Sequence, residues 1–152
     1  MLKTIIHDQY RDKIDQVSQL TGFLRPKEGW IRTLRKALGM SGPQLAKRLK
    51  VSKSQMSQME RFEMEDRITL KQLRKVAHAL DCELTYALVP NKPVDEMLRE
   101  RAWEKAKTLV EKTDVQMKLE SQQVDRNRLE TFIEKEAERL LRDMPRDLWE
   151  DE

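Results

Sequence analysis

The sequence predicts a mainly α-helical protein with one short strand, and three observations support this prediction. Serine or threonine is followed three residues later by glutamine at Ser41, Ser52 and Thr69, which is the pattern of a helix capping box. Only four glycines and five prolines occur among 152 residues, so long uninterrupted helices are favoured. Charged residues make up 38% of the chain and aromatic residues 5%, a composition typical of exposed helical surfaces.

The first 25 residues are expected to form an N-terminal helical arm, covering 1–25. Gly22 is suited to end a helix over 3–21, because glycine readily adopts the left-handed conformation found after helix ends. Apolar side chains follow the spacing of one helix face, at Ile6, Tyr10, Ile14 and Val17.

Residues 26–90 are expected to form a compact helical domain that ends in the strand. After a helix over 30–38, the capping boxes predict helices over about 42–49, 53–61 and 70–80. Each cap is also flanked by two hydrophobic residues, as in a hydrophobic staple. These pairs are Met40 with Leu45, Val51 with Met56, and Ile68 with Leu73.

The turn between the helices over 42–49 and 53–61 contains only Lys50, Val51 and Ser52. A connection of this length allows a tight turn, and the small Ala46 lets the two helices approach closely. Two helices joined in this way form a helix-turn-helix, whose second helix is free to enter the major groove of DNA.

The segment before Pro90 alternates between apolar and other residues, and this period of two predicts one short strand. A single strand leaves unpaired backbone groups at its edges, and no second strand is evident. We therefore expect the strand to pair with its equivalent in a second copy, giving a two-fold dimer. The apolar members of this dimer strand are Leu84, Tyr86 and Leu88.

Residues 91–152 are expected to form a charged helical extension for dimerisation or partner binding. Apolar stripes with helical spacing cover 94–113 and 129–144, whereas 114–128 is polar and weakly periodic. The extension is compatible with a dimer coil, an intramolecular cap or a clamp for another protein.

Charge is unevenly distributed along the chain. Residues 26–90 contain 13 Lys and Arg and seven Asp and Glu, whereas 91–152 contain 13 and 17. A basic middle and an acidic end suggest two surfaces with different partners.

Motifs of enzymes and of metal sites are missing from the sequence. It contains no Gly-rich phosphate loop, no Ser/His/Asp set and no HExxH motif, so we expect neither catalysis nor a metal or cofactor. His7 and His78 are isolated, and the single Cys82 excludes an intramolecular disulfide. No signal peptide and no run of about 18 apolar residues is evident, so we expect a cytoplasmic, nucleoid-associated protein.

The segment SGPQLAKRLKVSKSQMSQME, with LRKALGM before it and ITLKQLRKVAHAL after it, resembles the lambda-repressor-like (Xre-family) helix-turn-helix over 30–81. The longer pattern PKEGWIRTLRKALGM, ITLKQLRKVAHALDCELTYALVP and DEMLRERA is similar to the mobile mystery protein A family. This resemblance implies a transcriptional regulator and antitoxin encoded beside a Fic-domain partner. Gly42 and Lys50 depart from the repressor pattern, which often has glutamine and glycine at these positions.

Base-reading residues are expected on the exposed side of the helix over 53–61. Lys53 can donate to guanine acceptors, and Gln58 can pair with adenine through two hydrogen bonds. Ser54 and Ser57 are short enough to allow close approach. Contacts with DNA phosphates are expected from Gln44, Arg48, Lys50, Ser52 and Arg61.

Arg35 and Glu60 occupy positions that often carry a partly buried ion pair in this fold, so the resemblance implies a structural role for them. The leading interpretation is a homodimeric repressor of its own operon that binds double-stranded DNA and has a Fic-domain partner. Two alternatives stay open. One is a stand-alone dimeric repressor without a protein partner, and the other is an interaction module that restrains a Fic-domain enzyme.

Overall fold

A computed structural model describes residues 1–119 and 126–151, with side chains described over 1–113 and 126–151. In these ranges the chain contains seven α-helices and one short 3-10 helix, which confirms the mainly helical fold class. The chain folds into two compact units, one of residues 22–88 and one that combines 1–21 with 89–152. No helix of the described ranges is long and apolar enough to cross a membrane.

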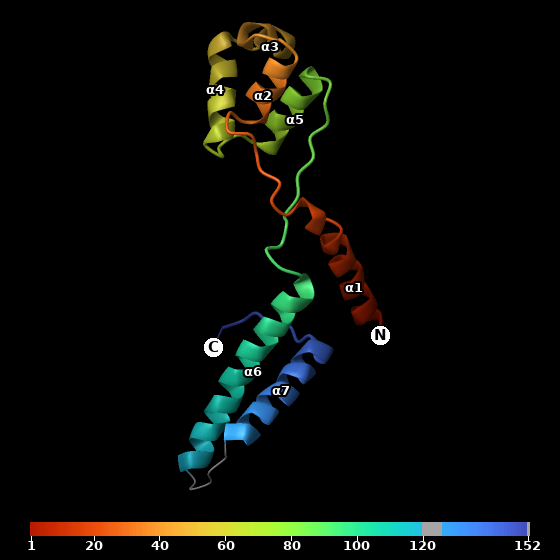
Figure 1. The fold of residues 1–152 in the computed structure, drawn as a ribbon, viewed down its shortest axis with the longest axis vertical. Helices are drawn as coiled ribbons and strands as arrows, with labels where there is room; N and C mark the ends of the chain where they lie inside the picture. Colours follow the sequence, from red (N-terminus) through yellow and green to blue (C-terminus); the bar gives the residue numbers. More distant parts are fainter. Residues whose placement is uncertain (120–125, 152) are drawn as a thin grey trace. The chain divides into compact units, whose positions relative to one another are not determined.

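The unit of residues 22–88 is built from four helices (Figure 1), α2 (Trp30–Ala37), α3 (Gly42–Leu49), α4 (Lys53–Met64) and α5 (Leu70–Ala79). α3 contacts both α4 and α5, and α2 contacts α4. Their inward side chains form one core, whose buried members are Ile31, Leu45, Ala46, Met56, Val76 and Leu80.

All three predicted capping boxes are present in this unit. At Ser41, Ser52 and Thr69 the hydroxyl accepts from the amide of the glutamine three residues later, and the glutamine side chain accepts from the cap amide. The six hydrogen bonds measure between 2.8 and 3.2 Å. Because these bonds satisfy donors that a helix start leaves free, α3, α4 and α5 begin where the sequence predicts.

The strand predicted before Pro90 is wrong, since no described residue is in a strand. A strand requires a hydrogen-bonded partner, and no other described segment pairs with residues 82–89. The alternation is kept only at its start, where Cys82 and Leu84 are half-buried. Further on, Tyr86 is 64% exposed and Leu88 is 87% exposed.

In the other unit, α6 (Val94–Leu119) and α7 (Arg126–Asp143) run antiparallel (Figure 1). The apolar stripes predicted for the extension face each other, and part of the polar stretch 114–128 lies outside the described residues. Their core consists of Leu98, Ala102, Ala106, Ile133, Ala137, Leu140 and Leu148.

α1 (Leu2–Asp15) is shorter than predicted and is followed by a 3-10 helix over Ser18–Leu20. Polar contacts join it to the α6–α7 unit: Lys3 Nζ donates to the carbonyl of Met144 at 2.9 Å, and Arg11 donates to Asp95 at 3.3 Å. No residue of α1 is buried. Its apolar stripe is therefore exposed to solvent.

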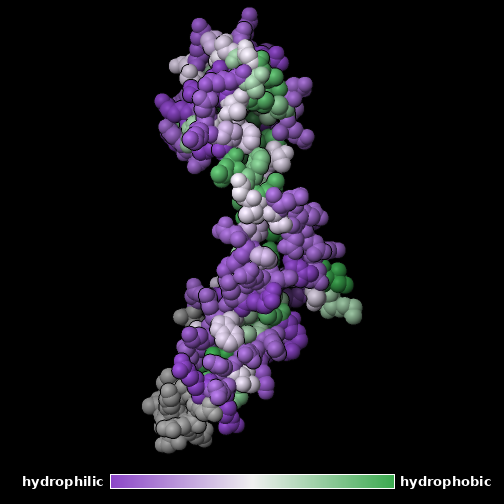
Figure 2. Space-filling view, viewed as in Figure 1, coloured by the Kyte–Doolittle hydropathy of each residue, from purple (hydrophilic) through white to green (hydrophobic). Residues whose placement is uncertain are grey.

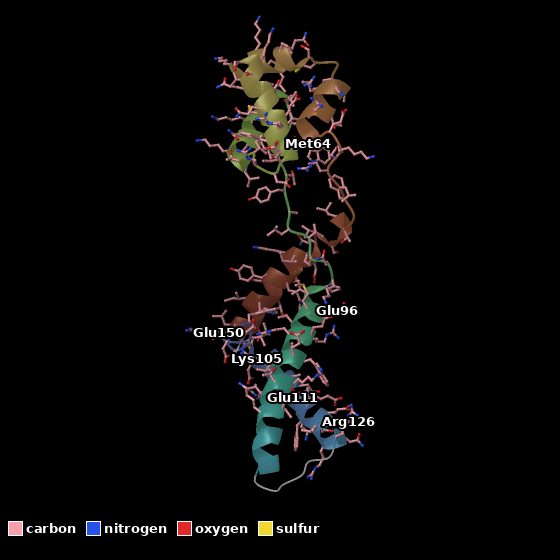
Figure 3. The ribbon with its side chains drawn as sticks, turned by 90° about the vertical axis from the view of Figure 1, so that its left-hand side faces the viewer. Met64, Glu96, Lys105, Glu111, Arg126 and Glu150 are labelled. Atoms are coloured by element: carbon pink, nitrogen blue, oxygen red, sulfur yellow. The ribbon has the colours of Figure 1, made fainter. Side chains whose placement is uncertain are left out.

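The segment after α7 folds back onto α6. Leu148 is 2% exposed in the core, and Arg101 Nε donates to its carbonyl at 2.7 Å. The amine of Lys105 donates to the carbonyl of Asp147 and, at 3.4 Å, to that of Glu150. Figure 3 shows Lys105 and Glu150 close together. Two basic side chains of α6 thus hold this acidic segment by its backbone.

Candidate nucleic-acid interface

α4 presents the four predicted base-reading residues to solvent. Lys53, Ser54, Ser57 and Gln58 are all exposed. Among the described residues, none of these four side chains has a hydrogen-bond or ion-pair partner. The opposite side of α4 faces the core, where Met56 is 1% exposed. The core therefore holds one side of α4 in place, while the side chains on its exposed side are free to bind a ligand.

The turn before α4 depends on Lys50, which adopts the left-handed conformation with φ 58° and ψ 41°. Its amide donates back to the carbonyls of Ala46 and Lys47, and the next amide, of Val51, also donates to Ala46 at 3.0 Å. A left-handed lysine costs roughly 1 kcal/mol more than a glycine. The chain thus accepts some strain and keeps an exposed cation directly before α4.

An ion pair joins Arg35 of α2 to Glu60 of α4. Arg35 Nε donates to Glu60 Oε1 at 2.8 Å, and Arg32 Nε donates to Glu60 Oε2 at 3.2 Å. The side chains of Arg35 and Glu60 are only 13% and 9% exposed. Arg35 also donates to the carbonyl of Met40 at 3.0 Å. One arginine therefore ties α4 to α2 and to the segment before α3.

The five predicted phosphate contacts have different surroundings. Gln44 and Ser52 both take part in capping boxes. Arg61 Nε lies 3.8 Å from Glu65 Oε1 in an exposed ion pair. Arg48 Nε donates to the carbonyl of Ala79 at 2.9 Å, so it also holds the end of α5.

Positive charge without a neighbouring carboxylate gathers on α3, on the start of α4 and on α5. Four carboxylates of the unit, Glu28, Glu60, Glu65 and Asp66, pair instead with Arg25, Arg32, Arg35, Lys36, Arg61 and Arg67. In the described residues no ion pair is formed by Lys47, Arg48, Lys50, Lys53, Lys71, Arg74 or Lys75. Hydrophilic side chains cover the α4 side of this unit in Figure 2. Uncompensated cations of this kind attract a polyanion.

Sequence reasoning missed the cations of α5. Together with Arg48, they line an open groove of about 680 Å³ between α3 and α5, here called the α3–α5 groove. The α5 cations, spaced by three and four residues on one exposed helix face, are Lys71, Arg74 and Lys75. That spacing was the available sequence signal. No cluster of three metal-binding side chains occurs in the part of the chain that the structure describes.

Residues 31–86 match the family model described as helix-turn-helix, a range that begins in α2 and contains α3, α4 and α5. Neither the curated proteins nor the solved structures gave a match. The matched model describes a DNA-binding regulatory domain rather than an enzyme family. The match supports neither membership of the mobile mystery protein A family nor a Fic-domain partner. Residues 31–86 are therefore a lambda-repressor-like (Xre-like) helix-turn-helix domain, and this domain indicates a DNA-binding transcriptional regulator.

Proposed function

We propose that this protein is a sequence-specific DNA-binding repressor that reads its operator with α4. The observation that carries this proposal is the combination of four exposed, unengaged side chains on α4 with a rigid attachment of that helix. Base readout needs free donors and acceptors held in a defined place. The buried Met56 and the Arg35–Glu60 pair supply the attachment.

In this proposal each side chain of α4 has a definite role. Lys53 donates to the acceptors of guanine, and Gln58 pairs with adenine through its amide. Ser54 and Ser57 allow close approach and add hydrogen bonds to bases or phosphates. Register on the duplex comes from backbone contacts, made by Gln44, Arg48, Lys50, Ser52 and Arg61.

We further propose that the repressor acts as a homodimer, because two recognition helices read two half-sites of an operator. Exposed apolar side chains support this idea, since Tyr86 and Leu88 are 64% and 87% exposed. A second copy that covers them would remove this apolar surface from water. Sedimentation of Tyr86→Ser/Leu88→Ser should show a monomer where the native chain is dimeric.

Control of its own operon and an antitoxin role remain parts of this proposal that rest on the sequence resemblance. Exposed aromatic side chains offer a surface for a protein partner in the α6–α7 unit, where Trp103 is 39%, Phe132 42% and Trp149 59% exposed. Co-purification with a Fic-domain protein encoded beside this one tests this role. A chain that regulates DNA but retains no such protein is a stand-alone repressor.

Selection from a random duplex pool tests the DNA-reading proposal directly. The purified full chain should enrich one short motif, present twice with two-fold symmetry for a dimer. The selected duplex should then bind at least a thousandfold more tightly than scrambled duplex, as expected for specific binders. A pool that shows no enriched motif at moderate salt would rule the proposal out.

A further inference from the structure

The α3–α5 groove contains basic side chains and no carboxylate. It is lined by Arg48, Leu49, Lys71, Arg74, Lys75, His78 and Ala79. On α5, residues 71, 74, 75 and 78 follow the spacing of a single helix face, and all four are exposed. One side of α5 is therefore basic from its first turn to its last.

This arrangement is unfavourable for α5 in isolation. Lys71 is the second residue of the helix, where the positive end of the helix dipole disfavours a cation. Arg74 and Lys75 follow Lys71 by three and four residues, a spacing that places like charges side by side on a helix. The first turn of α5 contains no acidic residue to offset them. A polyanion bound in the groove would relieve this repulsion.

Arg48 connects the groove with the surface near α4. It lines the α3–α5 groove, and it also lines a second hollow together with Gln44 and Lys47. Its Nε is held by the carbonyl of Ala79, and its Nη groups have no partner among the described residues. Lys50 and Lys53 follow Arg48 closely along the chain, so the unpaired cations continue toward α4.

The groove suits a nucleic-acid backbone better than an acidic protein segment. Protein interfaces depend on large apolar or aromatic anchors, and the lining of the groove has no aromatic side chain other than His78 and only two apolar residues, Leu49 and Ala79. The basic face of α5 is roughly 10 Å long, from a rise of about 1.5 Å per residue. Duplex DNA carries about one charge per 1.7 Å of its axis, so several phosphates lie within that length.

We infer that the α3–α5 groove is a second DNA-contacting surface, which grips the phosphate backbone beside the bases read by α4. The inference rests on the proposed DNA-binding function. Because the groove contacts phosphates alone, it adds affinity for any sequence and steepens the dependence of binding on salt. It leaves the choice of operator to α4.

The test uses the full chain and a 40-base-pair duplex of random sequence. The variant is Lys71→Ala/Arg74→Ala/Lys75→Ala, and a control, Lys27→Ala/Lys36→Ala/Arg67→Ala, removes the same charge elsewhere in the unit. Each lost phosphate contact lowers the slope of log affinity against log salt by about 0.9. The affinity lost between 50 and 200 mM salt should therefore be roughly 40-fold smaller for the groove variant than for the native chain. The control should change this ratio by less than about fourfold.

Equal slopes for the groove variant and the control would overturn the inference. A charge-keeping variant, Lys71→Arg/Arg74→Lys/Lys75→Arg, should retain the native slope, and loss of the slope in this variant also counts against the groove. Motif selection separates the two proposals. If a motif is enriched but the groove variant and the control have equal salt slopes, only the groove inference is rejected. If no motif is enriched but these two slopes differ, only the proposal of operator reading is rejected.

Discussion

Glu63 caps Ile31 across the helix-turn-helix unit: its Oε1 accepts a 2.8 Å hydrogen bond from the Ile31 amide. Its other oxygen accepts from the amide of Trp30 at 2.6 Å. Gly29, which precedes α2, has no side chain that could cap the helix. A carboxylate from the far end of α4 therefore satisfies the first donors of α2 and places negative charge at the positive end of its dipole.

Removal of this carboxylate should destabilise the unit strongly. Glu63 is 4% exposed, so Glu63→Ala leaves two amides of α2 without an acceptor in a place that water reaches poorly. We expect a loss of about 2–3 kcal/mol in unfolding free energy, from a lost cap and unsatisfied donors. Chemical denaturation measures it. Glu65→Ala is the control, because its ion pairs with Arg61 and Arg67 are exposed and worth about 1 kcal/mol at most. Similar losses for both variants would contradict the capping role.

Gly29 is required by the same carboxylate. A Cβ added there would lie 2.5 Å from Glu63 Oε2, at a φ of +85°. Gly39 also has a positive φ, +66°, but a Cβ there meets nothing within 4 Å. Gly39→Ala should therefore cost only about 1 kcal/mol of backbone strain. Gly29→Ala should cost at least about 2 kcal/mol more, because Glu63 must leave the amides and because the ψ of 161° at Gly29 belongs to a region that almost only glycine adopts.

A double-mutant cycle checks this explanation. In a Glu63→Ala background the extra cost of Gly29→Ala over Gly39→Ala should fall by about 2 kcal/mol, since the carboxylate that clashes is gone. The part that remains is the backbone strain at Gly29 and the contact of its Cβ with Met64 Sδ, 3.0 Å away. An extra cost that persists at full size would place the clash elsewhere.

The range of an interaction along the chain decides how far it could be predicted from the sequence. Each capping box joins residues three apart, so the starts of α3, α4 and α5 could be predicted. The contact of Glu63 with Ile31 spans 32 residues, and that of Arg48 with Ala79 spans 31. No local pattern encodes such contacts, and Arg48 was interpreted only as a phosphate contact.

Periodicity alone was a weaker guide. Apolar alternation after α5 predicted a strand, yet alternation does not supply the hydrogen-bonded neighbour that a strand needs. The helical spacing in α1 correctly predicted a helix, but it gave no information about which face is buried. There the polar face is held by Lys3 and Arg11, and the apolar face is exposed.

Lys50→Gly should stabilise the fold and weaken DNA binding. Glycine adopts the left-handed conformation of this turn without strain, so the unfolding free energy should rise by about 0.5–1 kcal/mol. The same change removes an exposed cation before α4 and should lower affinity for every duplex alike. A control that replaces another lysine with glycine, Lys36→Gly, would not separate the effect on stability from the effect on DNA binding, because Lys36 lies inside α2. Lys50→Asn is the better control, since asparagine also tolerates this conformation. A fall in stability for Lys50→Gly would show that the strain lies elsewhere.

An ion pair on α7 should contribute to stability above the acid range. Arg139 donates to Glu136 at 2.6 Å, and this hydrogen bond lowers the pKa of the Glu136 carboxyl. A lowered folded-state pKa means that the stabilisation is present above the unfolded pKa and is lost as the pH falls through the folded one. Between about pH 6 and about pH 3, native unfolding free energy should fall by roughly 0.3 kcal/mol more than that of Glu136→Gln. Glu138→Gln, an exposed change on the same helix, should follow the native curve. Parallel curves for the native chain and Glu136→Gln would show that the pair contributes nothing.

Substitutions on α4 should change specificity rather than affinity alone. Lys53→Ala and Gln58→Ala each remove a donor that base readout would use, so each should cost ~1–3 kcal/mol on the selected operator. On scrambled duplex Gln58→Ala should cost almost nothing, because the glutamine is uncharged and phosphates dominate that binding. Lys50→Gly provides the comparison, since a phosphate contact weakens both duplexes equally. Competition binding with the two duplexes measures both quantities. If Lys53→Ala lowered affinity equally for operator and scrambled DNA, its role would be a backbone contact, and the reading face would have to lie elsewhere on α4.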